Sequence, residues 1–115
     1  MKRIEAIIGS EKVLAVNEAL KNAGVGGCTI LDAKGRGKGE KPVVETGRGT
    51  GKYVSEFSVR ADIVIMVEDS EVDKVINTIV DTVSTGSAGD GKIFVSQISD
   101  AVDIGTKKRG QTAIV

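Results

Sequence analysis

The sequence predicts an α/β domain of the α+β type with the element order βαββαβ, the ferredoxin-like arrangement. Two kinds of hydrophobic periodicity support this order. Four segments have the alternating or continuously apolar patterns of strands, and two repeat apolar residues every three or four positions, as amphipathic helices do. The 115 residues suffice for one domain with a small core, so we expect a single domain spanning 1–115.

The first half of the chain supplies a strand, a helix and a second strand. Residues 2–8 place Ile4, Ala6 and Ile8 on one face and Arg3 and Glu5 on the other. This alternation predicts a half-buried strand. Ser10 is expected to cap the following helix, whose apolar residues recur at helical spacing until Gly24 ends it. After the Gly26-Gly27 turn, Cys28 to Ala33 is expected to form the second strand.

The stretch from Gly35 to Tyr53 is rich in glycine and basic residues, contains Pro42 and has almost no periodicity. It predicts a long loop without regular structure. Such loops beyond about 15 residues are uncommon in compact domains and are usually functional or disordered, so the stretch is either a working arm or a tolerated insertion. We favour the working arm, and we expect residues 38–52 to be mobile without a partner.

The second half repeats the pattern of the first. Residues 56–67 predict a third strand, apolar on both faces toward its end, and Asp69 or Ser70 is expected to cap a helix over 72–83. Residues 93–98 predict the fourth strand, and the tail from Ser99 is expected to be irregular. Two helices cover only one face of such a sheet, so the apolar run 63–66 predicts self-association through the other face.

Composition excludes several classes of function. Sixteen basic and sixteen acidic residues give a net charge of zero, which argues against nucleic-acid and membrane-surface partners. No apolar run is long enough to insert into a membrane, and the N-terminus does not resemble a signal peptide, so we expect a cytoplasmic protein. With one cysteine, Cys28, and no histidine, we expect no disulfide, no metal site and no catalytic nucleophile pair. We interpret Cys28 as a small buried hydrophobe.

The segment from Thr85 to Val95 carries the strongest chemical signal. Three glycines with Asp90 and Lys92 form a loop whose bare amides and lysine charge can bind an anion such as phosphate. Gly86 to Lys92 reads G-x-x-x-x-G-K, but Ile93 stands where a magnesium-binding Ser or Thr is needed, and the order helix–loop–strand is the reverse of a Walker motif. The alternative interpretation is a glycine-rich turn with a solvated lysine.

Three stretches of the sequence resemble the PII signal-transduction family. These are T-G-x-x-G-D-G-K-I-F-V at 85–95, similar to the family's B-loop and fourth strand, M-K-R-I-E-A-I-I at 1–8, and G-R-G-K at 35–38. The resemblance implies a homotrimer that binds ATP or ADP, with AMP as a further candidate, in clefts between subunits. It also implies a T-loop at about 37–55, a B-loop at about 84–92 and a C-terminal segment at about 99–115. In the family, the T-loop controls ammonium transporters and nitrogen-metabolism enzymes.

The resemblance also implies two groups of nucleotide-binding residues. One group matches the family's phosphate loop: Gly89, Asp90, Gly91 and Lys92. The other matches positions around the adenine, ribose and phosphates: Thr29, Gly35, Gly37 and Lys38. Tyr53 approximately matches the family's modifiable tyrosine.

Two departures from the family pattern bear on ligand choice. Asp103-Ile104-Gly105-Thr106 replaces a segment that usually carries two arginines for the polyphosphate, and Lys107, Lys108 and Arg109 just downstream are the only candidates to replace them. The glutamine that helps to hold Mg²⁺ and 2-oxoglutarate falls on Gly39, or on Glu40 with a shift of one. We therefore expect a weak or absent response to Mg²⁺ and 2-oxoglutarate, although Arg60 stands where the family has a lysine that meets the effector.

Three functions are compatible with the predicted fold. The first is a regulatory nucleotide-binding trimer. The second is a small ferredoxin-like enzyme of phosphate chemistry, which the sequence disfavours because it has no histidine and no paired carboxylates beside the glycine loop. The third is RNA binding, which the neutral charge and scarce aromatic residues disfavour.

Overall fold

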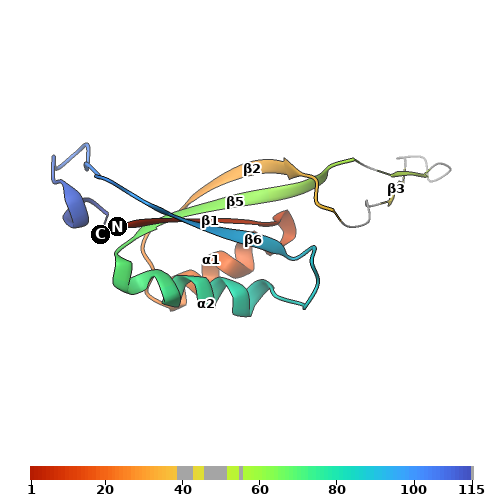
Figure 1. The fold of residues 1–115 in the computed structure, drawn as a ribbon, viewed down its shortest axis with the longest axis horizontal. Helices are drawn as coiled ribbons and strands as arrows, with labels where there is room; N and C mark the ends of the chain where they lie inside the picture. The colour runs from red at the N-terminus through yellow and green to blue at the C-terminus, as the bar shows by residue number, and fades with distance from the viewer. Residues whose placement is uncertain (39–42, 46–51, 55, 115) are drawn as a thin grey trace.

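The computed structural model describes residues 1–38, 43–45, 52–54 and 56–114. Within them, a four-stranded sheet lies over two helices in two layers (Figure 1). The strands and helices of this body are β1 (Lys2–Gly9), α1 (Val13–Asn22), β2 (Thr29–Gly35), β5 (Ser58–Val67), α2 (Val72–Val83) and β6 (Gly91–Gln97). The sheet order is β2-β5-β1-β6, and every neighbouring pair is antiparallel. The α+β ferredoxin-like fold predicted from periodicity is therefore confirmed.

The hydrophobic core lies between one face of the sheet and the two helices. Successive strand residues point to opposite faces, so every second residue of β1 and β5 reaches this core. The largest fully buried side chains are Ile4, Ile8, Val16, Ile63, Ile65, Val75 and Ile79. Because these residues come from two strands and both helices, the core joins the two halves of the chain.

The helices leave the opposite face of the sheet without a covering layer, and we call it the uncovered face. Its side chains include Arg3, Glu5 and Ile7 of β1, Thr29, Leu31 and Ala33 of β2, Arg60, Asp62, Val64 and Met66 of β5, and Lys92, Phe94 and Ser96 of β6. The apolar run in β5 is therefore divided: Ile63 and Ile65 face the helices, whereas Val64 and Met66 face the other way. Met66 is 39% exposed there.

The helix starts differ from those predicted. Neither Ser10 nor Asp69 or Ser70 makes a side-chain capping bond, because each helix begins with a short 3-10 turn, at Ser10–Lys12 and Asp69–Glu71. The Asp69 carboxylate instead binds the N-terminal ammonium of Met1 at 3.0 Å. That ion pair, mainly through its hydrogen bond, lowers the pKa of Asp69. Gly24 adopts φ 77° just after α1, so the predicted end of this helix is confirmed.

The arm after β2 contains two short strands that the sequence did not predict. Strands β3 (Val43–Glu45) and β4 (Lys52–Val54) pair antiparallel, so the expectation of a loop without regular structure is wrong for these residues. Both segments contain β-forming valine or tyrosine, and their pairing is local. Much of the segment 38–52, for which we expected mobility, lies outside the described residues, as do Gly39 and Glu40.

Three other details refine the predicted elements. Strand β6 begins at Gly91, so Gly91 and Lys92 are strand residues and not part of the loop. The tail has only a single bridge between Val102 and Arg109 and a 3-10 turn at Gly110–Ala113, as expected for an irregular segment. Cys28 is half-buried and packs against the core.

The division of β5 between two faces predicts opposite outcomes for neighbouring substitutions. We expect Ile65→Asp to unfold the chain, because Ile65 is 1% exposed and a buried unpaired carboxylate costs about 3–5 kcal/mol. Met66→Asp places the same charge on the uncovered face and should leave the subunit folded. Far-UV circular dichroism during thermal unfolding distinguishes them; equal loss of stability would contradict this assignment of faces.

Candidate functional site

The glycine-rich loop joins the end of α2 to the start of β6, at the end of the molecule where the β2 arm also leaves the body (Figure 1). Helix α2 ends at Val83 because Ser84 turns to an extended conformation. Gly86 then adopts φ 84°, a left-handed conformation that reverses the chain at little steric cost. The loop is therefore held between two regular elements that the core fixes in place.

The Asp90 carboxylate organises this loop from within. It accepts hydrogen bonds from the Thr85 hydroxyl and amide, both at 2.6 Å, and from the Ser87 amide at 3.2 Å. These bonds, the Thr85 hydroxyl first, lower the pKa of Asp90. The Ser87 hydroxyl in turn accepts the Gly89 amide at 3.2 Å. We expected bare amides in this loop, but the amides of Thr85 and Ser87 are bonded to Asp90 and those of Gly89 and Asp90 to Ser87.

Gly91 has a backbone role that the sequence did not reveal. Its φ is 135°, and a Cβ atom added there would lie 2.3 Å from the Ile7 carbonyl oxygen. Gly91 pairs with Ile8 across the β1–β6 ladder, so the absence of a side chain allows the two strands to approach. Lys92 pairs with Ile7, and its exposed side chain leaves from the uncovered face.

Arg60 connects this loop to the base of the arm. Its Nη1 donates a hydrogen bond to the Gly89 carbonyl at 3.1 Å. A Cβ atom on Gly35, the last residue of β2, would lie 3.5 Å from Arg60 Cγ, so the same side chain passes beside the point where the arm begins. This contact could not be predicted from the sequence, because Arg60 and Gly89 are 29 residues apart along the chain.

The remaining predicted site residues lie at the other edge of the sheet. Thr29 opens β2 and Gly35 closes it, while Gly37 and Lys38 follow. Strands β2 and β6 are the two edges of the four-stranded sheet, and three strand spacings amount to roughly 14 Å. The structure therefore brings Gly35, Gly37 and Lys38 to the same end of the sheet as the glycine loop, but it leaves the two groups on opposite edges.

Two further contacts involve the arm. Arg36 and Glu56 form an exposed ion pair at 3.1 Å across its base. Tyr53 is the central residue of β4 and pairs with Val44, but its side chain lies outside what the structure describes. Its modification stays a prediction.

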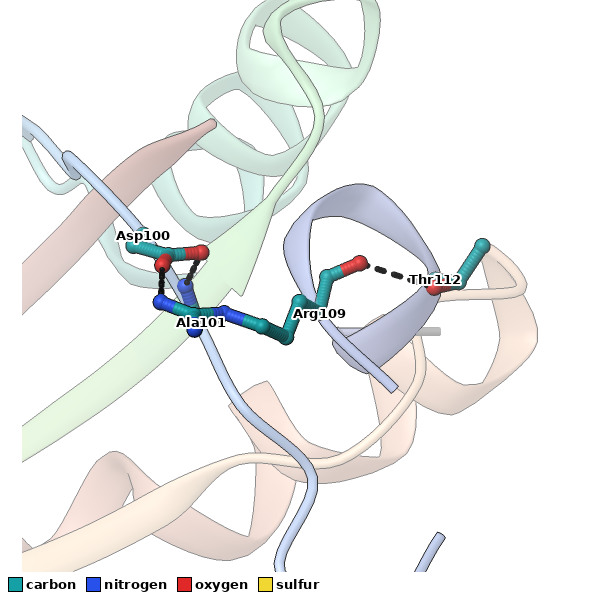
Figure 2. A network of polar contacts seen from close by, with 4 residues as sticks. All are labelled: Asp100, Ala101, Arg109 and Thr112. Atoms are coloured by element: carbon teal, nitrogen blue, oxygen red, sulfur yellow. Dashed lines mark hydrogen bonds and ion pairs between the residues drawn. The ribbon is translucent and has the colours of Figure 1, made fainter. Parts of the chain in front are cut away.

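The C-terminal segment has its own internal bonds (Figure 2). Arg109 forms an ion pair with Asp100, whose carboxylate also accepts the Ala101 amide at 2.8 Å; the Arg109 bond is the main cause of a lowered pKa of Asp100. Asp103 accepts the Thr106 amide at 2.9 Å, and that bond most strongly lowers the pKa of Asp103. Of the three downstream cations considered in the sequence analysis, Arg109 is therefore already paired.

A hollow of about 340 Å³ lies between α2, β6 and the loop. Its lining is mainly apolar, with Ile76 and Val80 of α2 opposite Ile93, while Ser87 and Asp90 close one end. Such a lining favours contact with an apolar group over contact with phosphate.

Comparison with known proteins identifies relatives of this chain over almost its whole length. The profile of the family described as Nitrogen regulatory protein P-II matches residues 1–108. The chain is 43% identical to a Nitrogen regulatory protein P-II of Rhodospirillum rubrum and 42% identical to one of Azospirillum brasilense, in each case over 99% of this chain and 100% of the relative. It is 40% identical to Nitrogen regulatory protein P-II 2 of Methanothermobacter thermautotrophicus, over 99% of this chain and 97% of the relative.

The chain belongs to the nitrogen regulatory protein P-II family. The resemblance found in the sequence is thereby confirmed, and the protein is placed among signal-transduction regulators of nitrogen metabolism. In this P-II chain, no helix of the described residues is both long and apolar enough to cross a membrane.

Gly89 in the glycine-rich loop and Gly91 at the start of β6 predict different responses to the same substitution. We expect Gly91→Ala to weaken the β1–β6 pairing, because its Cβ would overlap the Ile7 carbonyl and its backbone is left-handed, a strain of about 1–3 kcal/mol. Gly89→Ala is the matched control, since its Cβ would meet only Ser87 Oγ, at 3.7 Å. Urea unfolding measures both, and a Gly91→Ala protein as stable as Gly89→Ala would contradict the close approach.

Proposed function

We propose that this P-II protein is a non-enzymatic, cytoplasmic regulator that assembles as a homotrimer and binds adenine nucleotide between its subunits. The observation that carries the proposal is the position of the two groups of candidate binding residues. Gly89 to Lys92 and Thr29 to Lys38 lie on opposite edges of one sheet, and Arg60 spans from the base of the arm to Gly89 at the end that they share. A neighbouring copy that meets the uncovered face would close a site over both groups.

The phosphate loop supports this proposal through its charge and its backbone. Lys92 is exposed and projects from the uncovered face, which is the face that a neighbouring copy would meet. A phosphate can compete with Asp90 for loop amides, because both are anions that accept the same donors. Lys38, a point charge without the fork of an arginine, would add a second cation from the arm.

The C-terminal segment supports weak discrimination between ATP and ADP. Two arginines expected near a γ-phosphate are replaced by Asp103 and Gly105, and Asp103 carries a negative charge of its own. Arg109 is held by Asp100, which leaves Lys107 and Lys108 as the exposed cations of this turn. A charge-assisted contact is worth roughly 1.5–3 kcal/mol, so its loss removes most of the reason to prefer a third phosphate.

The response to 2-oxoglutarate and Mg²⁺ is proposed to be weak. Arg60, the cation at the corresponding position, already donates to the Gly89 carbonyl. A ligand at the T-loop base would have to replace that contact. The T-loop, residues 37–55, is proposed to meet an ammonium transporter or a nitrogen-metabolism enzyme, as the names of the relatives imply a role in nitrogen regulation.

Calorimetric titration of the intact protein with ATP, ADP and AMP tests nucleotide binding. We expect ATP and ADP to bind with similar affinity, Lys92→Ala to abolish binding, and Asp103→Arg to strengthen ATP binding selectively. Lys21→Ala on the exposed side of α1 removes a lysine far from the loop and should bind like the unmodified protein. If 2-oxoglutarate with Mg²⁺ tightens ATP binding tenfold or more, about 1.4 kcal/mol, the roles given to Asp103 and Gly39 are wrong.

Light scattering coupled to gel filtration tests the trimer. We expect a mass three times that of the chain at micromolar concentration, and we expect Met66→Asp to dissociate it, because the new charge lies on the uncovered face. A folded protein with the mass of one chain would rule out the trimer and the shared site together.

A further inference from the structure

Two carboxyl groups lie next to each other near the middle of the uncovered face. Glu5 pairs in register with Val64, and Asp62 pairs with Ile7 on the same two strands. Glu5 and Asp62 are therefore diagonal neighbours on one face, within reach of each other's side chains. This position is unusual for two acids, because like charges on neighbouring strands repel each other.

The side chains of the two acids can reach each other from these diagonal positions, and Arg3 donates a hydrogen bond to Glu5 at 2.8 Å. Ionised carboxylates only accept hydrogen bonds, so a hydrogen bond between Glu5 and Asp62 forms only when one of them carries a proton. Among the described residues, Asp62 Oδ1 is the one buried side-chain oxygen or nitrogen that has no hydrogen-bond partner. Asp62 thus lies in surroundings that disfavour its charged form.

The proton is assigned to Asp62. Burial, followed by the hydrogen bond and charge of Glu5, raises the pKa of Asp62 to about 6. The hydrogen bond from Asp62, followed by that from Arg3, lowers the pKa of Glu5. The arrangement at low pH is therefore a neutral Asp62 that donates to an ionised Glu5, which Arg3 neutralises.

The other charged groups near Asp62 are directed elsewhere. Arg60, two residues before it on β5, reaches the Gly89 carbonyl. Lys92 of β6 lies beyond Ile7, one strand further away. Strand β2 presents only uncharged side chains beside it on this face: Thr29, Leu31 and Ala33. Deprotonation of Asp62 therefore adds one uncompensated negative charge near the middle of the face.

The surroundings of this pair fit a second copy of the same chain. Leu31, Met66 and Phe94 expose large apolar side chains around it, at 49%, 39% and 51%. When Asp62 is neutral, the charges of Arg3 and Glu5 balance, so this region of each subunit enters an interface without net charge. When Asp62 is ionised, each subunit must bury one further negative charge, and that carboxylate loses its hydration.

We propose that joining copies of this chain through the uncovered face takes up a proton at the Glu5–Asp62 pair of each subunit, so that assembly weakens as the pH rises. The inference rests on the proposed trimer. Further burial on assembly raises the pKa of Asp62 above its value in the free subunit, which is about 6. The resulting stabilisation of the assembly is therefore complete below pH 6, and it is lost as the pH rises through the pKa of Asp62 in the assembly. Each proton taken up changes the assembly constant by up to about tenfold per pH unit.

Sedimentation at several protein concentrations between pH 5 and pH 8 tests this linkage. We expect dissociation of the unmodified protein to increase steadily above pH 6. Asp62→Asn keeps a donor for Glu5 but cannot ionise, so its assembly should be independent of pH over this range. Asp32→Asn is the matched control, because Asp32 is exposed on the opposite face of the neighbouring strand and should keep the pH dependence.

A second measurement applies if the assembly is too tight to dissociate at the concentrations used for sedimentation. Carboxyl NMR should find Asp62 titrating at or above about pH 6 in the intact protein, and at lower pH in Glu5→Gln. A trimer with pH-independent assembly, or an Asp62 that titrates near its ordinary value, would overturn the linkage but keep the trimer. Assembly that becomes tighter as the pH rises would also overturn the proposed proton uptake, because it would indicate that a cation of a neighbouring copy pairs with the ionised Asp62. A monomer at every pH would overturn both proposals.

Discussion

Hydrophobic contact between two helices and one face of a four-stranded sheet organises this protein. The contact buries Ile4, Ile63, Ile65 and Ile79, and it fixes both the start of β6 and the end of β2 at the same end of the molecule. Because both helices lie on that face, the other face keeps its side chains at the surface. The same packing that makes the core thus leaves a surface with apolar side chains around two acids.

The glycine-rich loop at 85–92 is held in shape by its own residues. Asp90 uses loop amides to hold the loop together, and Gly91 lets β6 approach the Ile7 carbonyl. Neither role requires a ligand. An anion that enters the loop would therefore meet a preformed turn. Binding would require loop amides to exchange the Asp90 carboxylate for the anion, but it would need little ordering of the backbone.

Charged side chains in three regions of this chain already contact other groups of the same chain. The C-terminal turn uses Asp100 and Asp103 to bind its own arginine and amides, so it is closed on itself. Arg60 is likewise occupied by the Gly89 carbonyl. On the uncovered face, Asp62 lies beside Glu5, and burial together with the neighbouring carboxyl raises the pKa of Asp62 to about 6. All three features concern the regions through which a P-II protein would meet nucleotide, effector or another subunit.

The sequence alone determined the fold class, the order of the elements and the family, because periodicity and the string 85–95 are local properties of the chain. It identified the apolar face of α2, whose first and last residues, Val72 and Val83, are also the ends of the helix. It misplaced the helix caps at Ser10 and Asp69, missed β3 and β4, and gave no hint of the Arg60–Gly89 bond or of the Glu5–Asp62 pair. These features depend on strand register and on contacts between residues distant in sequence. Only the tertiary structure decides which side chains meet, since a shift of one residue in β5 would turn Asp62 toward the helices and Ile63 toward solvent.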